Sequence, residues 1–320
     1  MKQTTKAWLI TAAALVLIGI LVFGGAMASH HWDFSALSTD KLETDTVDIQ
    51  EEFQSISIVS DTADIAFLPS GDGTCSVVFW KWDQERHAAS VQDGTLTIES
   101  NDTRSWLDHI GFRFGTPRIT VYLPRAEYAA LFIDESTGDV AIPADFAFES
   151  VDITASTGSV DCCVSASGSV RIKTDTGGIR IESISAGELD LSVSTGRVDV
   201  RSVVCRGSLG VSVSTGEAFL TDVACGSAVS GGSTGDITLE NVIAAGTITI
   251  ERSTGDVKLD RCDAAELLIK TDTGDVTGSL LSEKVFIADS DTGRIDVPKT
   301  GTGGRCEIST DTGDIVIAVS

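Results

Sequence analysis

The chain has 320 residues, 22% of them charged, and a formal net charge of −24. Its isoelectric point is near 4.3. Such an acidic balance argues against nucleic acid and anionic lipid headgroups as partners. The seven cysteines show no C-x-x-C spacing, which argues against a structural zinc site.

The N-terminus reads as a membrane anchor. Residues 1–6 contain Lys2 and Lys6, and residues 7–28 then run for 22 positions without a charge. As a helix this run is about 33 Å long, enough to cross a bilayer as a transmembrane helix. The lysines place residues 1–6 in the cytoplasm and the rest of the chain outside the cell. A signal peptide cleaved after Ala28 is the alternative, because Ala26-Met27-Ala28 fits such a site, but the run is longer than a usual signal core.

Residues 29–49 are polar and acidic and are predicted to form a tether. Residues 50–130 are predicted to form degenerate β coils and an N-terminal cap, since solenoids need atypical terminal units. Residues 57–65 resemble a degenerate copy of residues 309–315, and residues 101–116 look like an irregular insert. Most of the aromatic residues that follow the tether lie in this region. A distinct ligand-binding domain is therefore the alternative interpretation.

Residues 131–320 are organised by a Thr-Gly pair that returns ten times, every 19 or 20 residues. The glycines are Gly138, Gly158, Gly177, Gly196, Gly216, Gly235, Gly255, Gly274, Gly293 and Gly313. A period this short and steady is typical of a solenoid. At a strand spacing of ~4.8 Å, ten coils would build a rod about 48 Å long.

The flanks of each glycine alternate with period two. Counting the glycine as zero, positions −7, −5, +2 and +4 are mostly apolar, as in Leu189, Leu191, Val198 and Val200. Position +7 adds a further inward residue, which includes Leu281. Alternation on both sides of a turn means strand, turn, strand. We predict an all-β fold: a right-handed, single-stranded parallel β-helix, or β-solenoid, of about 19–20 residues per coil after an N-terminal transmembrane helix.

The repeated glycine has a structural role, because a tight turn between strands requires the positive φ that glycine adopts at low steric cost. The Ser, Thr or Asp at −2 is expected to hydrogen-bond the turn backbone. A second corner falls at +10 or +11, at Gly168, Gly187, Gly207, Gly226, Gly246 and Gly304. The one-residue difference between coils is thus absorbed at a corner, where it does not change a strand's register.

Acidic residues form the recurrent polar feature of the repeats. Asp236, Asp256 and Asp275 occupy +1 in consecutive repeats, and Asp272, Asp291 and Asp311 form a second file at −2. Like charges stacked in this way repel unless they cap turn amides or are bridged by cations. Turn capping is the simpler interpretation, and weak Ca²⁺ binding through oxygen ligands is the functional one. We expect no other cofactor and no catalytic residues, because no histidine lies in the repeats.

The repeat register places most cysteines inside the solenoid. Cys306 is at −7, Cys162 at +4 and Cys262 at +7, which are inward positions. Cys205 and Cys225 share +9, where other repeats have small residues. We read these five as small buried hydrophobes. Cys163 at +5 is expected to face outward.

The sequence stops at residues 311–320 in mid-pattern, so this last coil is expected to form an open end with unpaired backbone groups. Asp311 and Asp314 would protect that edge by charge. We expect a monomeric rod whose C-terminal edge can accept another strand, with assembly promoted as the pH falls toward the isoelectric point.

The Thr-Gly-Asp corners, such as Ser253-Thr254-Gly255-Asp256 and Thr310-Asp311-Thr312-Gly313-Asp314, resemble a bacterial family of unknown function called putative adhesin, the LiaG-like β-repeat proteins. The resemblance covers about residues 30–320. It implies a membrane-anchored surface β-solenoid and supplies no catalytic residues.

We therefore expect a non-enzymatic adhesin or envelope scaffold, a single-pass cell-membrane protein that binds a cell-wall, protein or carbohydrate ligand outside the cell. An accessory or sensor module in envelope-stress signalling is the alternative. A carbohydrate-active β-helix enzyme is disfavoured, because corners this short build no cleft.

Overall fold

A computed structural model describes residues 3–29, 31–32, 42–82, 86–101 and 115–320. Helix α1 spans Gln3–Ser29. Within it, Trp8–Ser29 is long and apolar enough to cross a membrane, and nearly all of its side chains are exposed in the part of the chain that the structure describes. This segment agrees with the predicted span at residues 7–28. Most of the insert expected at residues 101–116 lies outside the described residues.

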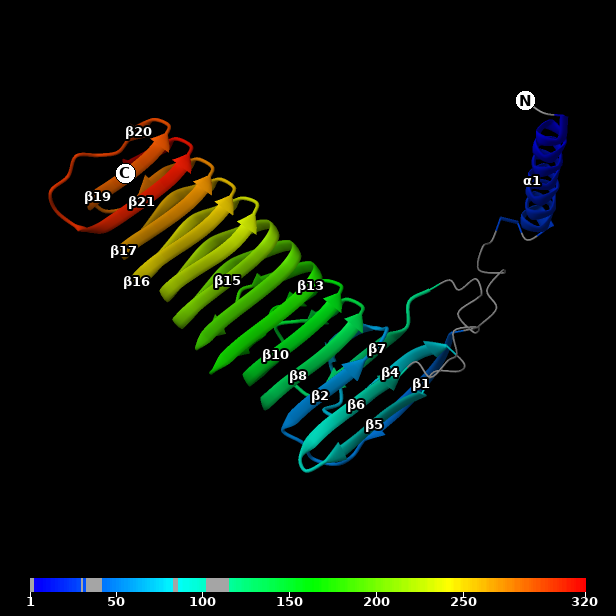
Figure 1. The fold of residues 1–320 in the computed structure, drawn as a ribbon. Helices are drawn as coiled ribbons and strands as arrows, with labels where there is room; N and C mark the ends of the chain where they lie inside the picture. The colour runs from blue at the N-terminus through cyan, green and yellow to red at the C-terminus, as the bar shows by residue number, and fades with distance from the viewer. Residues whose placement is uncertain (1–2, 30, 33–41, 83–85, 102–114) are drawn as a thin grey trace.

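The body of the protein is a β-solenoid of about ten turns (Figure 1). Its strands are β8 (Glu127–Thr137), β9 (Val140–Ile142), β10 (Ala147–Thr157), β11 (Val160–Cys162), β12 (Ser165–Ala166), β13 (Ser169–Glu182), β14 (Ser185–Ala186), β15 (Glu188–Thr234), β16 (Ile237–Thr254), β17 (Val257–Thr273) and β18 (Val276–Leu280). Each strand pairs in parallel with the equivalent strand of the next coil, so Ile153 lies between Ile133 and Ile172. The apolar residues at −7, −5, +2 and +4 thereby stack into one continuous core.

Five coils turn at a third corner that the sequence analysis did not predict. Position +6 holds a non-glycine residue with φ between 50° and 58°, namely Ser183, Ser202, Asp222, Asn241 and Arg261. This left-handed residue shifts the alternation, which is why +7 rather than +6 is buried, as at Val203. The prediction for Leu281 was wrong, because Leu281 is 43% exposed and Leu280 is buried in its place. That coil turns earlier instead, at Gly278 with φ +146°.

The N-terminal end is built from seven shorter strands: β1 (Leu42–Ile49), β2 (Ser55–Ser60), β3 (Asp64–Pro69), β4 (Cys75–Trp82), β5 (Arg86–Gln92), β6 (Thr95–Asn101) and β7 (Arg118–Leu123). Strands β2 and β3 pair with β8 and β9, so they form the degenerate coil expected at residues 57–65. Strands β6 and β7 form a further layer beneath them. The antiparallel strands β5, β4 and β1 close this end, so the expected tether loses residues 42–49 to β1.

The order of the layers at the C-terminal end differs from the order along the chain. Strands β21 (Gly304–Thr312) and β22 (Ile315–Val319) pair with β17 and β18 on one side. On the other side they pair with β19 (Lys284–Thr292) and β20 (Ile295–Asp296). The expectation that residues 311–320 form the open edge was therefore wrong. The physical reason is burial, because the inner face of β21 and β22 is mainly apolar, with Cys306, Ile308, Ile315 and Ile317, and gains most when it is covered on both sides.

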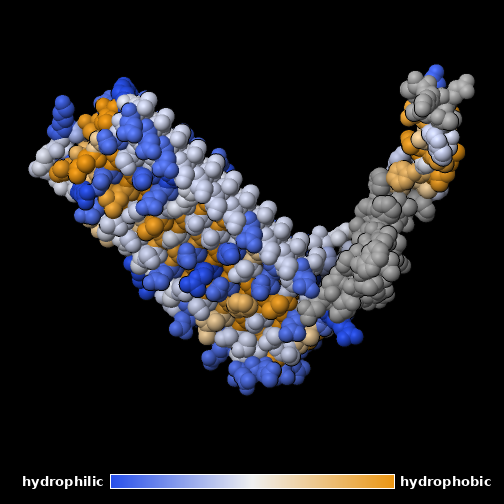
Figure 2. Space-filling model, viewed as in Figure 1, coloured by the Kyte–Doolittle hydropathy of each residue, from blue (hydrophilic) through white to orange (hydrophobic). Residues whose placement is uncertain are grey.

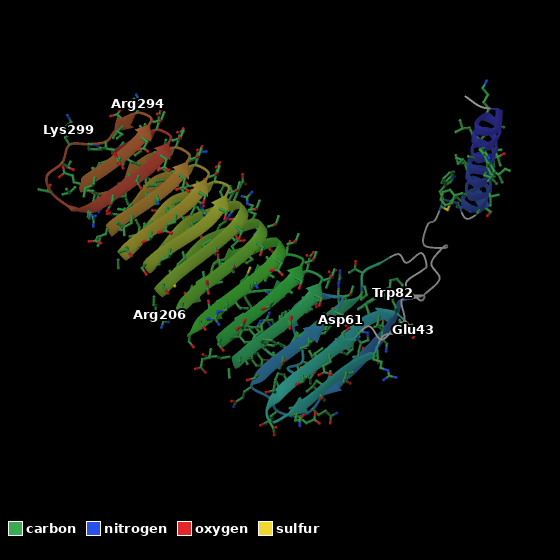
Figure 3. The ribbon with its side chains drawn as sticks, viewed as in Figure 1. Glu43, Asp61, Trp82, Arg206, Arg294 and Lys299 are labelled. Atoms are coloured by element: carbon green, nitrogen blue, oxygen red, sulfur yellow. The ribbon has the colours of Figure 1, made fainter. Side chains whose placement is uncertain are left out.

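The exposed layer at this end carries large apolar side chains as well as the exposed carboxylates of Asp289, Asp291 and Asp296. Val285 and Ile287 on β19 are 38% and 49% exposed, and Ile295 on β20 is 42% exposed. Figure 2 shows the resulting hydrophobic surface at the C-terminal end of the rod. Arg294 and Lys299 also project there, whereas Glu43 lies at the opposite end (Figure 3). Asp311 and Asp314 lie one layer in from the end, where Asp314 Oδ1 accepts the N–H of Arg294 in the outermost layer at 2.7 Å. The outermost edge is thus that of β19 and not, as predicted, that of residues 311–320.

The Thr-Gly corners stack directly on one another. A Cβ atom added to any of the ten glycines would lie between 1.7 and 2.2 Å from a backbone oxygen of the adjacent layer. Nine of them also have positive φ, between 125° and 159°, and Gly293 is the exception to the predicted conformation. The glycines are therefore required by interlayer contact as well as by the turn.

The corner geometry predicts a large difference between two valine substitutions. Gly196→Val places a Cβ 1.7 Å from the Gly177 oxygen at a φ of +151°, so a loss of more than about 3 kcal/mol in the free energy of unfolding is expected. Ser212→Val changes an exposed residue of the same strand and should change stability by less than about 0.5 kcal/mol. Urea unfolding of both variants measures this difference. Similar losses for both would contradict the assigned register.

Candidate functional site

The acidic file at +1 is built into the backbone of the stack. Asp236 Oδ1 accepts the N–H of Asp256 at 2.9 Å, and Asp256 Oδ1 accepts the N–H of Asp275 at 3.0 Å. Asp275 continues the ladder to Asp314 at 2.8 Å. Lys258 Nζ lies 4.0 and 3.9 Å from the carboxylates of Asp236 and Asp256. These carboxylates act as turn caps, with a lysine placed where a bridging cation would lie.

The second acidic file, at −2, lies along the outside of the corner. Asp291 and Asp311 are exposed, and Asp272 is half-buried. In space Asp311 lies between the other two, because β21 is inserted between β17 and β19. Within the described ranges, no group of three or more His, Cys, Asp or Glu side chains is arranged to hold a metal ion.

Position −3 forms an inner-corner column that the sequence analysis missed. Thr174, Thr271 and Thr310 donate their hydroxyl hydrogens to Gly158, Gly255 and Gly274 carbonyls at 3.1–3.2 Å. In the described part of the chain, the side chains that hydrogen-bond the corner backbone are those at positions −3 and +1, whereas the prediction had placed them at −2. The signal was available, because −3 continues the inward alternation of −7 and −5 and yet is polar in six of the ten repeats.

Glu135 is the acidic member of this column and is fully buried. Its Oε1 accepts hydrogen bonds from the N–H groups of Ala63 at 3.3 Å and Thr137 at 3.2 Å. It therefore joins the first Thr-Gly coil to the degenerate coil of β2 and β3. Burial raises the pKa of Glu135 to about 7, and the two amide hydrogen bonds oppose that shift.

A hollow of about 1040 Å³ lies under the N-terminal cap. Four carboxylates line it, those of Asp48, Glu51, Glu52 and Asp72. Its aromatic wall is Phe53 stacked on Tyr128, with ring centroids 6.0 Å apart, and Tyr128 stacks in turn on Phe148 at 5.6 Å. The Tyr128 hydroxyl donates to the Pro124 carbonyl at 2.9 Å, which fixes the ring. Carboxylates beside an aromatic surface suit a cationic or polyhydroxylated ligand.

All seven cysteines are free thiols. Six are buried, including the five predicted from the register, and Cys163 is the one that is partly exposed. Burial raises the pKa of the Cys162 thiol to about 12, so it remains protonated and unreactive at neutral pH. Cys205 and Cys225 stack on adjacent coils without a bond between them.

The fold and its corners define a β-solenoid repeat protein. Residues 53–218, just over half of the chain, match the model of the Toastrack domain, DUF4097. The protein belongs to this family, whose function is unknown. No curated protein matches the chain.

Three solved structures are similar at low identity. A putative lipid-binding protein from Parabacteroides distasonis has a TM-score of 0.49 and 17% identity over 75% of this chain and 95% of its own. A putative adhesin from the same organism has a TM-score of 0.48 and 12% identity over 85% and 98%. A putative adhesin from Bacteroides fragilis has a TM-score of 0.43 and 15% identity over 87% and 97%. The family assignment rests on the sequence match.

The raised pKa of Glu135 predicts a pH-dependent stability. The folded protein keeps this proton up to about pH 7, whereas the unfolded chain releases it near the usual 4.5, so stability falls as the pH rises between these values. The free energy of unfolding of Glu135→Gln should therefore exceed that of the wild type by up to about 3 kcal/mol at pH 8 and equal it near pH 4. The exposed neighbour Asp134→Asn is the control. Urea unfolding at both pH values measures the effect, and an unchanged difference between them would rule it out.

Proposed function

We propose that this protein is a non-enzymatic binding rod, anchored in the cell membrane by α1 and exposed outside the cell as an adhesin or envelope scaffold. The observation that carries the proposal is that an apolar helix, whose described side chains are largely exposed, precedes a stack of coils with one continuous core. An exposed apolar helix is stabilised by burial in a membrane. A solenoid with a continuous core is stiff enough to hold its far end away from that membrane.

The direction of insertion is supported by charge. Lys2 and Lys6 precede the apolar run, and the domain that follows it is strongly acidic. Positive residues are retained on the cytoplasmic side, so the rod would lie outside. The surplus of carboxylates would keep it clear of an anionic membrane surface.

The cap hollow supports binding rather than catalysis. Its acidic residues lie beside the Phe53 and Tyr128 rings. Burial raises the pKa of Tyr128 to about 12, so the phenol stays protonated and its ring is held in place by the hydrogen bond to Pro124. Such a surface fits a polyhydroxylated or cationic envelope component through stacking and hydrogen bonds. The corner carboxylates, which an enzyme would need free, are hydrogen-bonded to the stack instead.

The proposed topology predicts how Cys163 reacts in cells. The full chain should be labelled by a membrane-impermeant maleimide on intact bacteria, because Cys163 is the partly exposed thiol and would face outward. Cys163→Ser should remove the label, and lysed cells give the maximum for comparison. Labelling that requires lysis would refute the topology, and labelled protein released into the medium would show a cleaved signal sequence.

The binding role predicts retention of the full-length protein, solubilised in detergent, on purified cell-wall fractions. Glu51→Gln combined with Glu52→Gln removes two carboxylates from the cap hollow and should lower retention by about tenfold. Asp152→Asn combined with Asp190→Asn removes two exposed carboxylates from the solenoid body and is the matched control. Equal retention of both double variants and the wild type would place the binding surface elsewhere. No retention of the wild type would overturn the role.

A further inference from the structure

Arg252 occupies the inner-corner column, where the next coil has Thr271. The residue is 4% exposed. Its Nη2 donates to the Ser230 hydroxyl at 2.9 Å, and its Nε is buried without a hydrogen-bond partner among the described residues. A guanidinium has five N–H donors and stays charged in proteins. The core therefore leaves most of the hydrogen-bonding capacity of Arg252 unused.

The charge of Arg252 is also unpaired, in contrast to the other buried cation. Lys284 is equally buried, and its Nζ lies 2.6 Å from Asp263 Oδ1 and 2.7 Å from the Ser282 hydroxyl. In the described ranges no carboxylate lies within 4.0 Å of the Arg252 guanidinium. Burying an unpaired charge is costly, and burial lowers the pKa of Arg252 accordingly. An anion from outside the chain would offset this cost.

The missing side chain at Gly232 makes room for this guanidinium. Gly232 pairs with Arg252 in the adjacent coil. A Cβ atom on Gly232 would lie 1.7 Å from Arg252 Nη1 and 2.4 Å from the Val213 oxygen. Any side chain at 232 would therefore displace the guanidinium. Gly231, Gly232 and Arg252 together line a hollow of about 430 Å³ at the surface of the solenoid.

The remaining lining of this hollow is polar. It consists of the hydroxyl residues Ser212, Ser214, Ser233 and Ser253, the cation Lys270, and the carboxylates Glu251 and Asp272. Lys270 stacks on Glu251 in the parallel register. A second positive charge thus lies near Arg252, and the serines and carboxylates provide partners for ligand hydroxyl groups.

We propose that this hollow is a binding site for the oxyanion of a phosphorylated or carboxylated polyol. Arg252 and Lys270 would receive the anion, because a guanidinium pairs with phosphate or carboxylate through parallel N–H bonds. The volume exceeds that of a bare phosphate, and the serines with Glu251 and Asp272 suit the hydroxyl groups of a polyol. This inference gives a ligand class to the proposed binding role and rests on that role only for the ligand's location outside the cell.

The test measures ³¹P line broadening of inorganic phosphate and of glycerol 3-phosphate by the full-length protein in detergent, at fixed ionic strength. Both probes should broaden, glycerol 3-phosphate at lower concentration, and glucuronate should compete if carboxylates share the site. Arg252→Met should weaken apparent affinity by at least about tenfold. Arg171→Met, which removes an exposed arginine paired with Asp152 and Asp190, is the control and should bind as the wild type does.

A second variant keeps the test decisive if Arg252→Met fails to fold. Ser233→Asp places a carboxylate at an exposed position in the hollow and should abolish broadening while raising the melting temperature without phosphate. Equal broadening by the wild type and either hollow variant would overturn the proposal, as would no broadening by the wild type. Because these measurements use purified protein, their failure would leave Cys163 labelling and cell-wall retention unaffected.

Discussion

Backbone contact between glycines of successive layers is the constraint on which the rest of the structure depends. Parallel strands stack about 4.8 Å apart, and at the Thr-Gly corner this spacing leaves no room for a Cβ atom. The glycine fixes both the turn and the distance to the next layer. Every other position in the coil, inward or outward, is then set by its offset from that glycine.

The inner-corner column shows how this core admits polar groups. A threonine at −3 can reach the carbonyl of the glycine one layer away, so its hydroxyl is satisfied in an aliphatic interior. Glu135 satisfies two amides in the same way and links the regular coils to the cap. Arg252 departs from this pattern because the chain supplies too few acceptors for its N–H groups. The threonines and Glu135 make structural hydrogen bonds, whereas Arg252 keeps donors that a ligand could use.

At both ends of the rod the order of the layers differs from the order of the strands along the chain. Strands β21 and β22 lie within the stack and leave β19 and β20 outermost, while β2 and β3 lie inside β6 and β7. Repeated coils share one cross-section, so any coil can stack on any other, and the most apolar faces take the interior. The C-terminal end consequently presents exposed Val285 and Ile287 next to basic side chains and the exposed carboxylates of Asp289, Asp291 and Asp296.

The sequence by itself determined the solenoid, its period, the corner glycines and the buried cysteines, because each follows from spacing and alternation along one coil. It also located the apolar helix and the degenerate coil at residues 57–65. Tertiary structure decided what depends on neighbours in other layers: the order of the terminal coils, the left-handed corner at +6, and the partners of Glu135 and Arg252. A hydrogen bond between layers joins residues about 20 or more positions apart, and whether a buried charge finds a partner depends on the same distant residues. A local sequence pattern carries no information about which layer lies next.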